Sequence, residues 1–247
     1  MAATPAWPPQ STPRLFVATS LGEGVAVRVE GGQAHYLGTV MRTKVGDPVK
    51  LFDGTSGEWL AIAESVGKRD LTMVVRQRLR EAKVVPDLWL VAAPLKKGRI
   101  DWLTEKACEL GVARLTLVET RRTVVDRVNH DRLHAHMIEA AEQCGRTAVP
   151  ALDPLVKLTA LLRDWPADRA LFFADETGGV PAFDAMRAHA GPAAILIGPE
   201  GGFDSGERDA IRAVPQAVGI SLGPRILRAD TAAAAAAAVW MAAAGDW

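Results

Sequence analysis

Cysteine is scarce in this chain of 247 residues, which contains only Cys108 and Cys144 and no Cys-x-x-Cys pair. This scarcity argues against a zinc site built on thiolates and against the disulfide framework of a secreted domain. We therefore expect a protein of the reducing cytoplasm. A metal site is not expected on His130 and His134 either, because these residues belong to no HExxH sequence and have no obvious third ligand.

Long apolar runs and an excess of charge of one sign are also absent. The most apolar stretch, 231–244, is shorter than the roughly 20 residues that span a bilayer. The opening residues lack the basic block and apolar run of a secretory signal, so we expect no membrane insertion. The 29 Lys and Arg balance 29 Asp and Glu. This balance argues against non-specific coating of nucleic acid but leaves room for a local basic face.

The chain has an ordinary globular composition, 49% hydrophobic and 23% charged. Its sequence divides into regions with different secondary-structure patterns. Three prolines within the first nine residues predict a disordered lead-in over 1–13. From 14 to 82, short β-prone runs alternate with glycine-rich turns, and only 33–42 favours a helix, which is typical of a small barrel or sandwich. From 83 to 247 strands and helices alternate, which predicts a largely parallel sheet with helices on both faces. The expected strands of this second part are 88–92, 115–118, 170–174, 193–197 and 218–222, and the expected helices are 99–110, 130–145, 180–189, 206–214 and 231–244.

Two unusual loops follow expected strands, Gly-Pro-Glu-Gly-Gly-Phe at 198–203 and Gly-Pro-Arg-Ile-Leu-Arg-Ala-Asp-Thr at 223–231. In open parallel sheets, ligands bind outside the carboxyl ends of the strands. The glycines of the first loop allow the backbone to approach a ligand, and Glu200 disfavours phosphate and suits a neutral or cationic ligand. The second loop places Arg225 and Arg228 near the same edge of the sheet. Each loop alone could be a tight turn or a solvated loop, but the pair indicates two walls of one pocket.

Other polar residues suggest supporting roles. Asp204 and Glu207 have the spacing of a capping box before the helix expected at 206–214, and Asp230 or Thr231 could cap the last helix. Several basic residues follow successive strand ends and could form a rim that contacts RNA phosphates. They are Lys96, Lys97, Arg99, Arg121, Arg122 and Arg127.

These stretches resemble a known family. Residues 197–203 and 222–232 are closely similar to the two carboxyl-terminal motifs of the RsmE family, whose members are S-adenosylmethionine-dependent methyltransferases that modify N3 of a uridine in small-subunit ribosomal RNA. The resemblance runs in order over almost the whole chain beyond residue 13. Two departures are Asp230, where the family has Glu, and Tyr36, where it has His. Further similar stretches are 35–37, 40–42, 46–47, 51–54, 106–112 and 139–146.

The resemblance implies a PUA-like β-barrel at 14–82 and a SPOUT methyltransferase domain at 83–247, in which the carboxyl-terminal segment forms a trefoil knot. It also implies a homodimer, S-adenosylmethionine as cofactor, no metal, and ribosomal RNA or the assembled 30S particle as partner. We expect Arg225 and Arg228 to be catalytic, and we identify no general base. Cofactor contacts are expected at Leu196, Ile197, Gly198, Glu200, Gly201, Leu222, Gly223, Leu227 and Thr231, and RNA contacts at Arg14, Arg42, Lys97, Arg99, Arg121, Arg122 and Arg146.

Two alternatives stay open at this point. The chain could be a SPOUT methyltransferase that acts on another RNA, such as a tRNA 2′-hydroxyl, or it could be a non-catalytic RNA-binding or ribosome-assembly protein. A nicotinamide oxidoreductase is disfavoured, because the turn after 88–92 lacks the dinucleotide-binding glycines.

Overall fold

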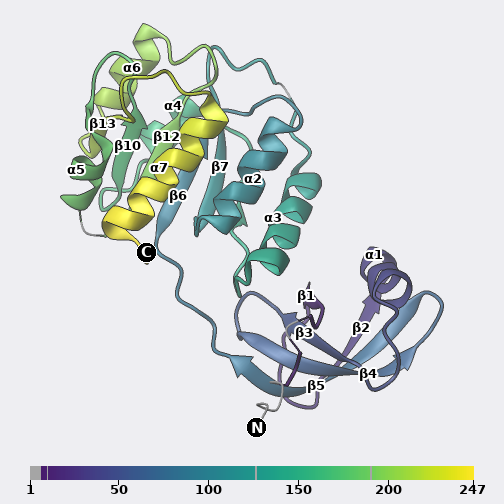
Figure 1. Cartoon of the computed structure of the whole chain (residues 1–247). Coiled ribbons are helices and arrows are strands. Elements are labelled where there is room, and N and C mark those ends of the chain that lie inside the picture. Colours follow the sequence, from purple (N-terminus) through teal and green to yellow (C-terminus); the bar gives the residue numbers. More distant parts are fainter. Residues whose placement is uncertain (1–6, 10, 126, 190) are drawn as a thin grey trace. The chain divides into compact units, whose positions relative to one another are not determined.

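The computed structural model describes residues 7–9, 11–125, 127–189 and 191–247. The chain forms two compact units, one of residues 1–84 and 141–148 and the other of residues 85–140 and 149–247 (Figure 1). The disorder predicted for 1–13 falls partly outside the described residues, which leave out 1–6 and 10. The predicted domain limits, 14–82 and 83–247, stay a prediction.

The first unit is built on a five-stranded sheet with the order β1-β3-β4-β5-β2. Strand β1 runs parallel to β3, and the other neighbours are antiparallel. Register shifts between β4 and β5 mark β-bulges, which bend and twist a sheet. Alternate side chains, such as Val27 and Val29, are buried in one apolar core. The strands are β1 (Arg14–Phe16), β2 (Ala26–Glu30), β3 (Pro48–Phe52), β4 (Glu58–Val66) and β5 (Asp70–Arg80).

A short helical segment interrupts the strands of the first unit. It was predicted as one helix over 33–42, but the structure has an α-helix, α1 (Gly31–His35), followed by a π-helix, η1 (Tyr36–Val40). The backbone N–H of Met41 donates to the carbonyl of Tyr36 at 2.9 Å, the i to i+5 bond of a π-turn. Arg42 follows with a φ of 56°, a left-handed conformation that ends the helical segment.

A buried ion cluster stabilises the first unit. The carboxylate of Glu58 accepts hydrogen bonds from Arg14 and Arg80. The guanidinium of Arg14 also donates to the carbonyls of Ala141 and Arg146, and it lies 3.9 Å from the ring centroid of Phe52. Arg14 therefore holds residues 141–148 against the sheet in this unit.

The second unit is built on a parallel sheet with the order β11-β13-β10-β12-β6-β7-β8, and β9 also pairs with β7. Within the described residues, all of these strands pair in parallel. All carboxyl ends therefore meet at one edge, as predicted. The strands are β6 (Leu88–Ala92), β7 (Arg114–Glu119), β8 (Ala151–Leu152), β9 (Val156–Lys157), β10 (Ala170–Ala174), β11 (Val180–Pro181), β12 (Ala193–Ile197) and β13 (Ala217–Ser221).

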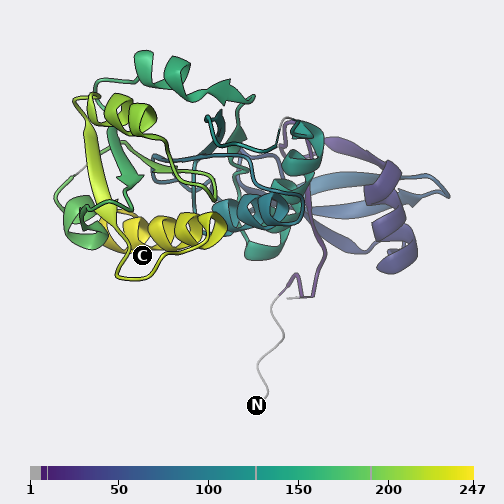
Figure 2. The same cartoon turned by 90° about the horizontal axis from the view of Figure 1, so that it is seen from above.

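Helices cover both faces of this sheet, which confirms the predicted class. Side chains of α2, α3, α5 and α7 pack with Ile195 and Ile197 on one face, while α4 and α6 pack with Leu196 on the other. Figure 2 shows these two layers, with the yellow α7 on one side of the sheet and the green α4 and α6 on the other. The helices are α2 (Arg99–Glu109), α3 (His130–Cys144), α4 (Leu158–Arg163), α5 (Ala182–Arg187), α6 (Ser205–Arg212) and α7 (Ala229–Ala244).

The shortest elements escaped prediction. Strands β8, β9 and β11 have two residues each, too few to give a periodic pattern. The helix predicted over 180–189 is shorter, because Val180 and Pro181 pair with Ile220 and Ser221 as a strand instead. Within the described residues, no helix combines the length and the apolar character needed to cross a bilayer.

Candidate functional site

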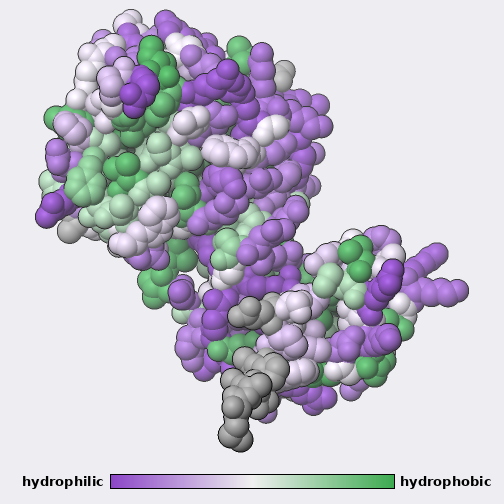
Figure 3. Space-filling view, in the orientation of Figure 1, coloured by the Kyte–Doolittle hydropathy of each residue, from purple (hydrophilic) through white to green (hydrophobic). Residues whose placement is uncertain are grey.

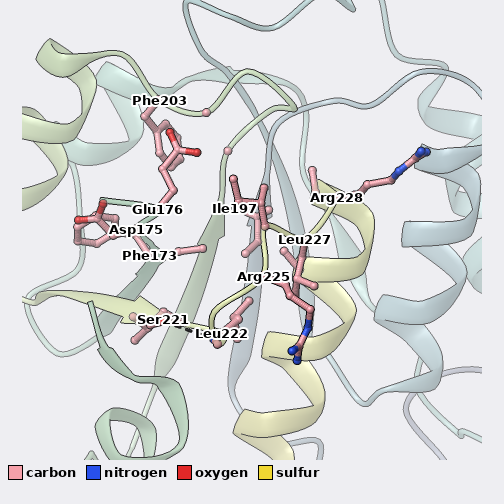
Figure 4. Close-up of a pocket in the computed structure, with 18 of the residues that line it drawn as sticks. Phe173, Asp175, Glu176, Ile197, Phe203, Ser221, Leu222, Arg225, Leu227 and Arg228 are labelled. Atoms are coloured by element: carbon pink, nitrogen blue, oxygen red, sulfur yellow. Dashed lines mark hydrogen bonds between the residues drawn. The ribbon is translucent and has the colours of Figure 1, made fainter. Parts of the chain in front are cut away.

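A cavity of about 510 Å³ lies at the carboxyl edge of the parallel sheet. Its walls are the segments that follow β10, β12 and β13, together with the first turn of α7 (Figure 4). Because β10 pairs with both β12 and β13 in parallel register, the three segments leave the sheet side by side. The two glycine-bearing loops singled out in the sequence therefore form parts of one cavity.

The first loop, 198–204, follows β12 in a tight turn closed by a 2.8 Å hydrogen bond from the N–H of Gly202 to the carbonyl of Pro199. Gly202 has a φ of 67°, and a Cβ added there would lie 2.5 Å from a carboxylate oxygen of Glu176. At Gly198 an added Cβ would lie 3.1 Å from the ring of the buried Phe203. A side chain at Gly202 would therefore be strained by the left-handed backbone, and one at Gly198 would press against the ring of Phe203.

The second loop, 222–228, carries both predicted catalytic residues into the cavity lining. Arg225 and Arg228 are exposed and come from opposite ends of the apolar pair Ile226 and Leu227. Figure 4 shows the two guanidinium groups pointing in different directions, with Arg228 directed toward the blue-green helix α2. The loop therefore offers cationic groups to two neighbouring regions.

Helix α7 starts earlier than the sequence suggested. Its first residue is Ala229 and its N-cap is Arg228, with no hydrogen bond from the cap side chain. Neither Asp230 nor Thr231 is the cap, and the Asp230 carboxylate accepts a 2.8 Å bond from the N–H of Thr231. Ala229 and Ala232 line the cavity, so the positive end of the helix dipole lies at its wall.

The third wall was missed by sequence reasoning. It is the Asp175–Gly178 segment after β10, from which Asp175, Glu176 and Gly178 line the cavity. Polar residues followed by Gly178 and Gly179, directly after a predicted strand, were the available signal. Burial raises the pKa of Asp175, but hydrogen bonds from Thr177 and Arg212 outweigh that effect and lower the pKa below its ordinary value. Asp175 is therefore a charged structural anchor.

The predicted capping box is confirmed, and it also braces the cavity. Asp204 accepts from the N–H of Glu207 at 2.7 Å, and Glu207 accepts from the N–H of Asp204 at 3.0 Å. Glu207 further accepts from the N–H of Arg121 at 2.7 Å, while Arg122 donates to the carbonyl of Gly201. The segment after β7 is thus fastened to the loop after β12.

Most of the expected cofactor residues meet at the cavity. Leu196 does not line the cavity, and its side chain packs into the core on the face of α4 and α6. Gly201 faces the side chain of Arg122, and Thr231 is exposed beyond the first residues of α7. All nine cofactor roles stay predictions. The expected residues that line the cavity are Ile197, Gly198, Glu200, Leu222, Gly223 and Leu227.

The expected RNA contacts have different surroundings. Arg14 has a structural role, because its side chain is 11% exposed and bonded to Glu58. Arg99 forms an ion pair with Asp230 at 3.6 Å, and Arg121 forms one with Asp204 at 3.2 Å. The remaining expected contacts include the exposed Arg42, Lys97 and Arg122 and the half-buried Arg146. Within the described residues, no group of three or more His, Cys, Asp or Glu could hold a metal ion.

Comparisons with known proteins identify the class. The family described as "RNA methyltransferase domain" matches residues 81–241, and the one described as "RNA methyltransferase PUA domain" matches 29–75. The chain is 29% identical to ribosomal RNA small subunit methyltransferase E of Rickettsia conorii, covering 91% of this chain and 93% of that one. The Bacillus subtilis protein of the same name is 28% identical, with 85% and 87% covered.

A solved structure supports the same class of protein. A Legionella pneumophila protein, described as a methyltransferase with the bound cofactor SAM, is 28% identical with a TM-score of 0.86, covering 96% of this chain and 99% of that one. The fold and the site thus define an RNA methyltransferase of the SPOUT type with a PUA-like amino-terminal domain. The chain belongs to the ribosomal RNA small subunit methyltransferase E (RsmE) family.

Proposed function

We propose that this protein methylates N3 of a specific uridine in 16S ribosomal RNA, with S-adenosylmethionine as the methyl donor. The observation that carries the proposal is the cavity at the carboxyl edge of the sheet, walled by both Gly-Pro loops, in a chain whose RNA methyltransferase match spans 81–241. Because the proposed substrate is ribosomal RNA, we place the reaction in the cytoplasm.

The residues of the cavity suit S-adenosylmethionine. Its volume of about 510 Å³ lies within the roughly 300–1,000 Å³ of small-molecule sites. Apolar side chains such as Ile197, Leu222 and Leu227 would contact the adenine ring. The carboxylates of Glu176 and Glu200 lie at the wall, where they would attract the cationic sulfonium and ammonium groups. Backbone groups of Gly198 and Gly223 would provide the remaining polar contacts.

The cofactor supplies an activated methyl group, so the protein has to place and polarise the uracil ring. Holding the reacting atoms in line can supply several kcal/mol of the barrier reduction. As the imide proton leaves N3, negative charge spreads to the neighbouring carbonyl oxygens of the base. Arg225 and Arg228 carry donors that would stabilise that charge. Asp175 is a poor proton acceptor, because its pKa is lowered and its oxygens are bonded to Thr177 and Arg212.

A homodimer is part of the proposal. The outward face of α7 presents small apolar residues that are only partly buried, among them Ala234, Ala238 and Val239. Figure 3 shows pale green residues gathered along this helix. Trp102 on the neighbouring α2 is 39% exposed. Such a face suits a second copy of the chain, and the mass of the particle in solution, measured by light scattering, tests it.

The function is tested with purified protein, labelled S-adenosylmethionine and small ribosomal subunits that lack the modification. After digestion of the RNA, label is expected in N3-methyluridine. Label in a different nucleoside would redirect the assignment to another target atom, and absence of label from all RNA would refute it. Parallel reactions with protein-free 16S RNA show whether the assembled 30S particle is required.

The glycine at position 202 provides a test of the cofactor site. In Gly202→Ala the left-handed backbone costs about 1–2 kcal/mol, and the flexible side chain of Glu176 has to move away from the added Cβ. We expect the affinity for S-adenosylmethionine, measured by calorimetry, to fall by about tenfold. Gly206→Ala is the matched control, because an added Cβ there lies 3.5 Å from its nearest neighbour. Equal affinities of the two variants would show that the turn does not shape the site.

A further inference from the structure

A second cavity, of about 390 Å³, opens in the methyltransferase unit. It lies between the segment after β6 and the segment that leads into α3. Its polar lining consists of Lys97, Arg127, Arg132 and Asn129, and the rest is apolar. None of these residues lines the cofactor cavity.

The charge of this second cavity favours an anion. No carboxylate is found among its described lining residues, whereas the cofactor cavity contains Asp175 and Glu176. Arg132 is paired with Asp101 at 3.1 Å. Lys97 and Arg127 are exposed, and neither forms an ion pair with a carboxylate of the described residues. Two cations are therefore available to a ligand.

The remaining walls favour a ligand that has an apolar part as well as a charge. Leu95 and Ile100 on one side and Val128 on the other provide apolar surface beside the cations. A free phosphate would leave this surface unused, whereas a nucleotide has both an anionic phosphate and a flat ring. The volume also lies within the range of sites for small molecules.

The position of the cavity connects it to the first one. Strand β6 is the parallel neighbour of β12, so the segments that follow them leave the same edge of the sheet. The 3.6 Å pair of Arg99 and Asp230 brings the first turn of α2 to the first turn of α7. Arg228 points from the cofactor cavity toward α2 (Figure 4). Cationic groups therefore lead from one cavity to the other.

We propose that the second cavity binds a nucleotide of the substrate RNA that flanks the target uridine. Lys97 and Arg127 contact its phosphate, and its base packs against Ile100 and Val128. The inference rests on the proposed function, since it assumes that RNA is the substrate. Holding a flanking nucleotide fixes the orientation in which the target base enters the cofactor cavity.

The test compares the double variant Lys97→Ala/Arg127→Ala with the wild-type protein in binding to in-vitro-transcribed 16S RNA over a range of salt concentrations. We expect the affinity to fall by about 10- to 100-fold and the salt dependence to decrease by about two counterions. The affinity for S-adenosylmethionine, measured by calorimetry, is expected to stay within about twofold, because neither residue lines that cavity. Arg163→Ala/Arg187→Ala removes the same charge from helices that end at the opposite edge and is the matched control.

Equal RNA affinity and salt dependence in the double variant and the control would overturn the proposal. Uridine monophosphate that binds as tightly as the RNA would also overturn it, because the cavity would then serve a free nucleotide. So would a change in oligomeric state, which would assign the cavity to a subunit interface. If the wild-type protein binds the RNA through these residues but methylates none, only the proposed function fails.

Discussion

Replacing Arg228 with alanine is expected to lower the turnover number by about 10²–10³-fold, the usual effect of removing one preorganised donor to a developing negative charge. Arg228 lines the cavity at the N-cap of α7, where the helix dipole adds positive potential. Its side chain is exposed, makes no capping bond, and forms no ion pair with a carboxylate of the described residues. The guanidinium is therefore available to the substrate. Single-turnover kinetics at saturating cofactor measure the effect on the chemical step.

The affinity for S-adenosylmethionine and the thermal midpoint should change little in Arg228→Ala, because the side chain makes no hydrogen bond or ion pair with the described residues of the loop or the helix. Arg228→Lys keeps the charge but loses the planar set of donors, so it should recover only part of the rate. Full turnover in Arg228→Ala would remove this residue from catalysis. The same measurement on Arg225→Ala then shows whether the neighbouring arginine has that role.

The sheet could be predicted because its central strands are buried on both faces. Residues 88–92, 170–174 and 193–197 are continuous apolar runs, and the structure places β6, β10 and β12 at these bounds. Alternating strands and helices imply a parallel sheet, and a parallel sheet brings the carboxyl ends together. The convergence of both Gly-Pro loops on one cavity followed from these two steps.

The third wall could have been found by the same rule. Asp175 and Glu176 directly follow a predicted strand, but they belong to no Gly-Pro motif. For Leu196, in contrast, the sequence could not show which way the side chain points. Side chains alternate along a strand, so Leu196 and Ile197 face different sides. The sequence does not tell which of the two faces the cavity, because both faces of this sheet are apolar.

Long-range ion pairs were beyond prediction. Arg14 was expected to contact RNA. Its partner Glu58 is 44 residues away, and its backbone acceptors at 141 and 146 are more than 120 residues away. Only the fold brings these groups together, and no local pattern marks them.

Replacing Glu58 with alanine is expected to lower the free energy of unfolding by about 3–5 kcal/mol, the usual cost of removing one partner from a buried ion pair. The side chains of Glu58 and Arg14 are only 6% and 11% exposed. Without Glu58, the Arg14 guanidinium would be left largely desolvated in the sheet that carries the first unit. Denaturant unfolding at neutral pH measures the loss.

Acid should lower the free energy of unfolding of the wild-type protein, because it protonates the same carboxylate. Burial raises the pKa of Glu58, but Arg80 and Arg14 outweigh burial and lower the pKa below its ordinary value of 4.5. The stabilisation is therefore complete above pH 4.5 and is lost as the pH falls through the lowered pKa. Glu58→Ala should lack this part of the acid dependence. Glu64→Ala, at the exposed end of the same strand, is the control. If both variants unfold at the same denaturant concentration, the buried cluster does not stabilise the first unit.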